Sequence, residues 1–284
     1  MKFIDYFSPE KDIIKEKFNT IPYMDVWISS IVEGYIYENV SKQSEFGSRE
    51  EYTHRYGKKE GEAKGWLDNG KLYFQAYFKD GKEHGKITRW NEYGKILQKF
   101  YCKNGKVEGK LKDYRTDGSL FIQVYSKEGK IEGNYKKFWN NTKVWVNAYY
   151  KDGKLEGEYK EFLHKGGLSK ICYYKEGELE GEYKEWWSNG VLQKHVYYKE
   201  GLMEGDFKSW HNNGQLEHHF YYNKEGNVEG EANTWWANGQ LCTQSHYKDG
   251  NKHGEYKTWS MEGQLHEHKL YEDGKIVKDL LLTL

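Results

Sequence analysis

The sequence predicts an all-β protein, an elongated single-layer antiparallel sheet of tandem 24-residue β-hairpin repeats with a short N-terminal capping helix. Three observations predict this fold: glycines recur at a fixed period, Asn-Gly and Asp-Gly pairs mark turns, and short aromatic segments separate the turns. The composition agrees, because the 284 residues include 31 glycines, 2 prolines, 17% aromatic and 37% hydrophobic residues. Such a chain is too polar for a thick core and too aromatic for disorder.

The glycines form two series, each with a period of 24 residues. The first series contains one step of 25 residues, near Asn223, and comprises Gly57, Gly81, Gly105, Gly129, Gly153, Gly177, Gly201, Gly226, Gly250 and Gly274. The second series lapses once, at Thr142, and comprises Gly70, Gly94, Gly118, Gly166, Gly190, Gly214, Gly239 and Gly263. Each repeat therefore carries two turns.

The residues before these glycines indicate the type of turn. Asp152-Gly153 and Asn189-Gly190 are examples of the Asp-Gly and Asn-Gly pairs that favour two-residue type I′ turns, in which both central residues have positive φ. The segments between the turns, such as 182–187 and 195–199, have the length and aromatic content of strands. The repeat therefore reads as strand, turn, strand, turn.

If both turns have two-residue loops, the strand register follows directly. In the repeat that begins at Gly177, we expect Tyr174 opposite Leu179, Trp187 opposite Leu192 and Trp186 opposite Gln193. The packed face of the sheet is then predicted to hold Leu179, Tyr183, Trp187, Leu192, Val196 and Tyr198. The Leu192 position is aliphatic in all nine repeats, as an apolar ladder requires.

Aromatic residues are predicted to line the opposite side, which we call the ring-bearing face. One ladder comprises Trp66, Trp90, Tyr114, Phe138, Phe162, Trp186, Trp210, Trp235 and Trp259. A second comprises Tyr77, Tyr101, Tyr125, Tyr149, Tyr173, Tyr197 and Tyr221. These rings can stabilise the sheet by packing along it, or form a contact surface, because Trp and Tyr dominate binding hot spots. Both roles can hold together.

Two positions expected on the ring-bearing face vary strongly between repeats. One position reads Tyr73, Leu97, Phe121, Trp145, Ser169, Gln193, Glu217, Cys242 and His266, and its neighbour reads Gln75, Lys99, Gln123, Asn147, Ile171, His195, His219, Gln244 and His268. Such variation arises from drift at unselected surface sites or from selection for a partner. Aromatic rings and variable side chains coincide on this face between about Phe121 and Trp210, with Phe138 expected opposite Trp145. We therefore predict partner-binding residues at Phe121, Phe138, Trp145, Phe162, Trp186 and Trp210.

The repeat resembles a known family. Residues 149–162, which read Tyr-Tyr-Lys-Asp-Gly-Lys-Leu-Glu-Gly-Glu-Tyr-Lys-Glu-Phe, resemble the bacterial variant of the MORN (membrane occupation and recognition nexus) repeat. The resemblance covers about residues 57–284 and implies the β-hairpin repeat fold. It implies two kinds of function: antitoxin-like or immunity-like proteins among bacterial relatives, and scaffolds or lipid-associated modules among eukaryotic ones. A shared fold does not by itself decide between them.

We divide the chain into four parts. Residues 1–33 are expected to form an N-terminal cap with a short amphipathic helix over about 9–19, 34–56 a degenerate repeat, 57–273 nine tandem repeats and 274–284 a C-terminal cap. The N-terminus is charged and lacks the apolar core of a signal peptide, and no apolar stretch approaches the roughly 20 residues of a membrane span. We therefore expect a cytoplasmic protein.

The sequence offers few groups for catalysis, and we expect no enzyme, no cofactor and no metal site. His195, His219 and His268 share a repeat position, but equivalent positions lie two strands apart, about 9 to 10 Å, whereas zinc ligands converge at about 2 Å from one ion. The three cysteines, Cys102, Cys172 and Cys242, occupy different repeat positions and are expected to be small, largely buried hydrophobes.

Two functions remain as hypotheses. The first is a protein-binding scaffold, with a toxin as the partner in an antitoxin or immunity role. The alternative is a peripheral lipid-associated module. The 44 basic and 44 acidic residues cancel, which disfavours an anionic membrane and argues against nucleic acid. The sequence does not predict the oligomeric state.

Overall fold

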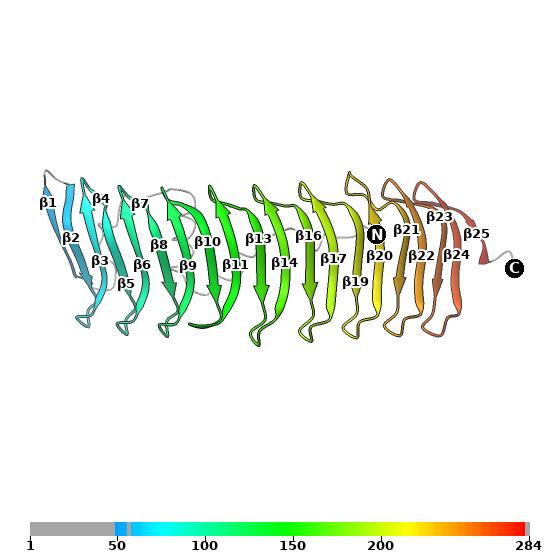
Figure 1. Ribbon diagram of the computed structural model, residues 1–284, viewed down its shortest axis with the longest axis horizontal. Helices are drawn as coiled ribbons and strands as arrows, with labels where there is room; N and C mark the ends of the chain where they lie inside the picture. The colour runs from blue at the N-terminus through cyan, green and yellow to red at the C-terminus, as the bar shows by residue number, and fades with distance from the viewer. Residues whose placement is uncertain (1–48, 56–57, 282–284) are drawn as a thin grey trace. The chain divides into compact units, whose positions relative to one another are not determined.

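The computed structural model describes residues 49–55 and 58–281, and in this part of the chain all 25 elements are β-strands. They belong to one antiparallel sheet, in which each long strand pairs with the next long strand along the chain (Figure 1). The predicted all-β architecture of hairpin repeats is thereby confirmed. The predicted helix over 9–19 and the rest of the predicted N-terminal cap lie outside the described residues. The same described part contains no helix with the length and apolarity needed to cross a membrane.

The strands divide between two compact units, residues 1–133 and 134–284. In the first unit the strands are β1 (Arg49–Arg55), β2 (Lys58–Trp66), β3 (Leu72–Lys79), β4 (Lys82–Glu83), β5 (Gly85–Trp90), β6 (Ile96–Lys103), β7 (Lys106–Val107), β8 (Gly109–Tyr114) and β9 (Leu120–Lys127). The strand β10 (Lys130–Phe138) contains the boundary between the units.

The second unit continues with β11 (Val144–Lys151), β12 (Lys154–Leu155), β13 (Gly157–Phe162), β14 (Leu168–Lys175), β15 (Glu178–Leu179), β16 (Gly181–Trp186), β17 (Leu192–Lys199), β18 (Leu202–Met203), β19 (Gly205–Trp210), β20 (Leu216–Tyr222), β21 (Gly230–Trp235), β22 (Leu241–Lys248), β23 (Asn251–Trp259), β24 (Leu265–Glu272) and β25 (Lys275–Asp279). A repeat therefore contributes two long strands, and a short strand such as β15 often precedes the first of them.

Among the described residues, the turns of the first glycine series from Gly81 onward are the predicted two-residue turns, except at Gly226. Asp152 and Gly153 have φ values of 52° and 83°, so both central residues are left-handed, as a type I′ turn requires. Tyr174 pairs with Leu179, as predicted. The single 25-residue repeat differs, because its extra residue lengthens the turn: Gly226 N–H donates to Asn223 O and Asn223 N–H donates to Asn227 O.

The turns of the second glycine series are longer than predicted. Trp187 N–H donates to Val191 O at 2.8 Å, and Gly190 N–H donates to Trp187 O at 2.9 Å. Gly190 has a φ of 86°, whereas Asn189 is not left-handed. This is a three-residue loop, a type I turn followed by a left-handed glycine. The prediction of a two-residue Asn-Gly turn here was wrong because Asn also suits the last right-handed position of a type I turn.

A β-bulge compensates for the longer loop. Glu185 pairs with Lys194 and Tyr183 with Val196, but Trp186 pairs with Leu192 and not with Gln193 as predicted. Gln193 is therefore an extra residue: the loop shifts the register by one residue and the bulge shifts it back. The same irregularity recurs in eight hairpins, with extra residues Tyr73, Leu97, Phe121, Ser169, Gln193, Glu217, Cys242 and His266.

The core of the second unit lies on the predicted packed face. Its buried cluster contains Leu179, Tyr183 and Val196, and Tyr198 packs against it. Two other residues predicted on this face do not form the predicted Trp187–Leu192 pair. Trp187 is half-buried at the start of the three-residue loop, and Leu192 pairs with Trp186. In the first unit, the buried apolar residues include Ala63, Ala76, Ile87, Phe100, Cys102, Val107 and Leu111. The free cysteines Cys102 and Cys172 are buried, and Cys242 is half-buried.

Sequence reasoning missed a polar row within the packed face. Glu185 and Lys194 pair two residues from the Tyr183–Val196 pair, so they share its face. Lys194 is only 6% exposed, and its ammonium lies 5.1 Å from the centre of the Tyr183 ring and 5.5 Å from that of Phe207. Burial lowers the pKa of Lys194. The aromatic rings and Glu185 compensate for the buried charge.

Candidate functional site

Seven tyrosines on the ring-bearing face form what we call the tyrosine row. Each is 37% to 49% exposed: Tyr77, Tyr101 and Tyr125 in the first unit, and Tyr149, Tyr173, Tyr197 and Tyr221 in the second. In the second unit three of the four tyrosines pair with acids, Tyr173 with Glu158, Tyr197 with Glu182 and Tyr221 with Asp206. Exposed rings and carboxylates therefore alternate along this part of the face, whereas in the first unit Tyr101 and Tyr125 pair with Lys86 and Lys110.

The carboxylates of the tyrosine row are held by neighbouring donors. Glu182 lies 2.6 Å from Lys184 Nζ and 3.0 Å from His195 Nε2, and it accepts a 3.4 Å hydrogen bond from the Tyr197 hydroxyl. The hydrogen bond from Lys184 is the main cause that lowers the pKa of Glu182. In the next repeat, Asp206 lies 3.1 Å from His219 Nε2. The variable neighbour position, which includes His195 and His219, therefore faces the tyrosine row, as predicted.

The other variable position coincides with the bulges. We call the eight extra residues the bulge row. Successive residues of a regular strand point to opposite faces, but here bulge residues contact their own neighbours: the Tyr73 and Phe74 rings are 4.9 Å apart, and Glu217 lies 3.7 Å from His218. The bulge turns the side chain toward the packed face. The prediction that this position lies on the ring-bearing face is therefore corrected.

A bulge residue also contacts the residue that begins the loop of its own hairpin. The guanidinium of Arg115 lies 4.5 Å above the Phe121 ring, and His211 lies 3.9 Å from Glu217. Trp145 occupies the same repeat position, and its ring stacks on Trp139 at 4.4 Å. These contacting residues, which we call loop–bulge pairs, differ chemically from one hairpin to the next.

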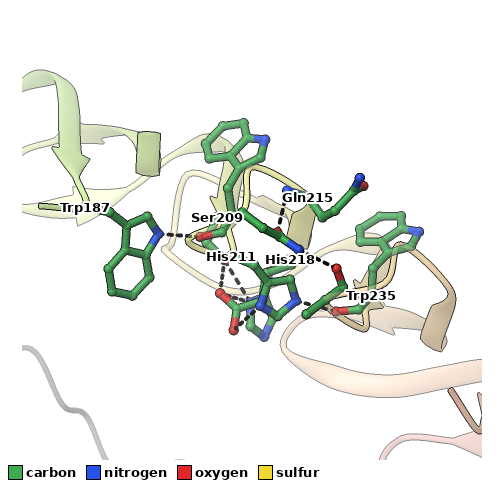
Figure 2. Close-up of polar contacts among 10 residues, drawn as sticks. Trp187, Ser209, His211, Gln215, His218 and Trp235 are labelled. Atoms are coloured by element: carbon green, nitrogen blue, oxygen red, sulfur yellow. Dashed lines mark hydrogen bonds and ion pairs between the residues drawn. The ribbon is translucent and has the colours of Figure 1, made fainter. Parts of the chain in front are cut away.

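In the second unit, three residues that begin these loops are anchored to the following repeat (Figure 2). The indole N–H of Trp187 donates to Trp210 O at 2.8 Å, and that of Trp139 donates to Phe162 O at 2.9 Å. His211 Nε2 lies 2.9 Å from Trp235 O. These loop side chains are therefore fixed in orientation by hydrogen bonds to the backbone of the next repeat.

The polar cluster around His218 deserves comparison with a catalytic triad. Ser209 Oγ lies 2.8 Å from His218 Nδ1, and Glu217 lies 3.7 Å from the same ring nitrogen (Figure 2). A Ser-His-acid relay needs the serine and the acid on different ring nitrogens. The cluster is therefore a hydrogen-bond network around a histidine whose pKa is lowered by burial. Among the described residues, no group of His, Cys, Asp and Glu side chains could hold a metal ion.

The structure places the six predicted partner-binding residues in three settings. Phe121 of the first unit and Trp145 of the second belong to loop–bulge pairs. Phe162, Trp186 and Trp210 are half-buried and pair with Leu168, Leu192 and Leu216, respectively. Phe138 is buried, with 9% exposure, so little of its ring is open to a partner.

Comparison with known proteins gives limited matches. No curated protein matches the chain. One solved structure with some likeness is "Crystal Structure of TcdB2-TccC3-Cdc42", with 9% sequence identity and a TM-score of 0.15. That match covers 80% of this chain but only 17% of the other chain, and a TM-score this low carries no argument about fold or function. Four segments of the chain, residues 59–80, 179–200, 203–224 and 228–249, are matched by the MORN repeat variant.

Proposed function

We propose that the protein is a non-catalytic repeat scaffold that binds a protein partner through its loop–bulge pairs. One observation carries the proposal: the turns repeat, while the bulge residue changes from tyrosine to leucine, phenylalanine, serine, glutamine, glutamate, cysteine and histidine along the chain. Bulges redirect side chains and are frequent beside functional sites. A constant framework with one redirected variable position suits specific recognition.

The chemistry of these pairs supports a protein partner. In the second unit, Trp139 and Trp145 are stacked, and the ammonium of Lys137 lies 4.3 Å from the centre of the Trp145 ring. In the first unit, Arg115 covers Phe121. Trp, Tyr and Arg are the residue types enriched in binding hot spots. Because hydrogen bonds already fix the loop residues, binding costs little additional side-chain entropy.

The finer proposal is an antitoxin or immunity-type role in the cytoplasm, with a toxin as the bound partner. Its support is the resemblance of the repeats to bacterial MORN-variant proteins described in that role, together with the four MORN-variant segments. A peripheral lipid-associated module is the weaker candidate. On the ring-bearing face of the second unit, Lys160 and Lys184 form ion pairs with Glu158 and Glu182, both at 2.6 Å, and this partial neutralisation weakens the attraction of anionic lipid.

Affinity capture from lysate of the source cells, read by mass spectrometry, tests the scaffold proposal. The double variant Trp139→Ala/Trp145→Ala should lose at least tenfold in capture of a partner recovered by the wild-type protein, since two hot-spot rings are removed. Tyr93→Ala is the matched control, because Tyr93 is 69% exposed in a loop and belongs to no loop–bulge pair. Equal loss in both variants, or no loss in either, would contradict the proposed site.

Salt distinguishes the two classes of partner. Contacts made by buried rings should persist at about 0.15 M salt, where the Debye length is about 8 Å, whereas lysine contacts to lipid headgroups weaken. We therefore expect salt-tolerant protein capture and no co-sedimentation with anionic phosphatidylserine vesicles. Vesicle binding that is abolished by changing Lys160, Lys184 and Lys208 to Glu would favour the lipid module instead.

A further inference from the structure

We propose that the tyrosine row of the second unit binds a proline-rich segment in the polyproline II conformation, which lies across the strands so that every third ligand residue meets a successive tyrosine. The inference goes beyond the proposed function, because it concerns the ring-bearing face and not the loop–bulge pairs. It names a ligand chemistry that can be tested with synthetic peptides. The site consists of Tyr149, Tyr173, Tyr197 and Tyr221.

The spacing of the row matches one turn of a polyproline II helix. Equivalent residues of successive repeats lie two strands apart, which corresponds to about 9.4 to 9.8 Å. A polyproline II helix has three residues per turn and a rise of about 3.1 Å per residue, or about 9.3 Å per turn. The mismatch is at most about 0.5 Å per repeat. Over the three intervals between four tyrosines it reaches about 1.5 Å, less than half of a van der Waals contact of about 3.5 to 4.0 Å.

Other regular peptide conformations fit this spacing less well. In an extended strand, a third residue lies about 10 Å away, but its side chain points to the opposite face because the side-chain period is two residues. In an α-helix, side chains seven residues apart share a face, but they are separated by about 10.5 Å. That mismatch accumulates to about 2 to 3 Å over three repeats. Polyproline II alone keeps every third side chain on one side at about the tyrosine spacing.

The chemistry of the row also suits a proline-rich ligand. Each ring is about half exposed, so one part packs on the sheet and the other offers an apolar surface. A polyproline II segment has no internal hydrogen bonds and exposes carbonyl acceptors, while proline lacks an N–H. A donor stands beside the rings: the ammonium of Lys184 contacts Glu182 and retains further N–H groups. Donors on the protein therefore complement acceptors on the ligand.

The local charge favours an uncharged ligand. Two of the acids between the tyrosines have a lysine two residues later at ion-pair distance, Glu158 with Lys160 and Glu182 with Lys184, both at 2.6 Å. Asp206 lies 3.1 Å from His219. This balance gives little attraction for a polyanion such as nucleic acid, whose affinity depends on unpaired basic residues. A proline-rich segment needs no such charge.

Fluorescence anisotropy of a dye-labelled proline decamer, titrated with the full chain, tests the inference. A decamer spans four contacts at every third residue, so we expect binding, with weaker binding for a proline heptamer that reaches only three tyrosines. The double variant Tyr173→Ala/Tyr197→Ala should weaken decamer binding at least tenfold. Tyr173→Phe/Tyr197→Phe should retain most of it, because the ring contacts remain. Circular dichroism and thermal unfolding establish that both variants are folded.

Two controls make the result decisive. A Gly-Ser decamer, which is flexible and lacks proline rings, should not bind, and Tyr93→Ala should bind the proline decamer like the wild type. Equal binding of both decamers, no loss in the double alanine variant, or binding of cellohexaose in place of the proline peptide would overturn the inference. Protein capture through Trp139 and Trp145 is measured separately, so failure of the proline peptide leaves the scaffold proposal standing, and failure of capture leaves this inference standing.

Discussion

Asp113 occupies in the first unit the repeat position that Glu185 occupies in the second, and it provides a prediction that can be worked out in magnitude. Its carboxylate is only 3% exposed, in β8 of the first unit, and burial raises its pKa to about 6, from an ordinary value of 3.8. The Tyr114 N–H donates to it at 3.1 Å, which only partly offsets desolvation. Because the folded pKa exceeds the unfolded pKa, the unfolded chain loses its proton first as pH rises.

The sign and size of the effect follow from linkage. Between about pH 4 and pH 6 the folded state binds more protons than the unfolded state, so stability falls as pH rises through this window and stays lower above it. The difference of about 2.2 pKa units corresponds to about 3 kcal/mol at about 1.36 kcal/mol per unit, as an order of magnitude. Asp113→Asn should therefore stabilise this hairpin by up to about 3 kcal/mol at pH 7 and change it little at about pH 4.

Hydrogen exchange of the β8 and β9 amides, compared between the variant and the wild type at the same pH, measures this difference. Asp117→Asn is a matched control in the same hairpin, since Asp117 is exposed and its pKa is lowered by the hydrogen bonds from Ser119. It should act in the opposite direction, by removing a favourable interaction. If Asp113→Asn protected these amides no better than the wild type at pH 7, or protected them equally at both pH values, the assignment of a desolvated carboxylate would be refuted.

Three further predictions concern the second unit and the turns, and urea unfolding midpoints can check all of them. Lys194→Met should leave stability unchanged or raise it, whereas Glu185→Gln should lower it by up to about 3 kcal/mol, because it removes the negative charge that favours the buried ammonium. Val196→Ala, in the buried cluster, should cost about 1 to 3 kcal/mol, whereas Val277→Ala on an exposed strand should cost almost nothing. Glu176→Asn should stabilise by about 0.5 to 1 kcal/mol, since Glu176 has a φ of 53° and asparagine tolerates the left-handed region better.

Much of the fold could be predicted because glycine tolerates left-handed backbone conformations, so its positions in the sequence mark the turns. Asp152-Gly153 has two left-handed residues, as its sequence indicates. The Tyr183–Val196 pairing also follows from the repeat, because the hydrophobic pattern fixes which residues share the packed face. The seven exposed tyrosines lie where side-chain alternation predicts them.

The bulge could not be predicted from the same reasoning. Asn189-Gly190 suits a two-residue type I′ loop and also the last two positions of a three-residue loop, so the dipeptide does not fix the loop length. The longer loop together with a bulge leaves the inner pairs, such as Glu185–Lys194, unchanged. Local sequence preference therefore does not distinguish a two-residue loop from a three-residue loop with a bulge, although the Gln193 side chain lies on a different face of the sheet in each.

The buried polar row was missed for a different reason, although a signal for it existed. Glu185 and Lys194 alternate correctly with Tyr183 and Val196, so strict period-two counting places them on the packed face. Charge by itself favours solvent exposure, because charged residues are rarely buried without a partner. Only the three-dimensional structure shows that Lys194 lies between the Tyr183 and Phe207 rings.

The most direct test of the scaffold account is the hydrogen-exchange footprint of a captured partner on the chain. If the loop–bulge pairs hold the partner, amides of the three-residue loops, such as 187–191 and 211–215, should gain protection in the complex together with the starts of the strands that follow them. The two-residue turns, such as 152–153 and 176–177, should exchange as they do in the free protein. Protection confined to the two-residue turns, or no protection in the three-residue loops, would contradict the account.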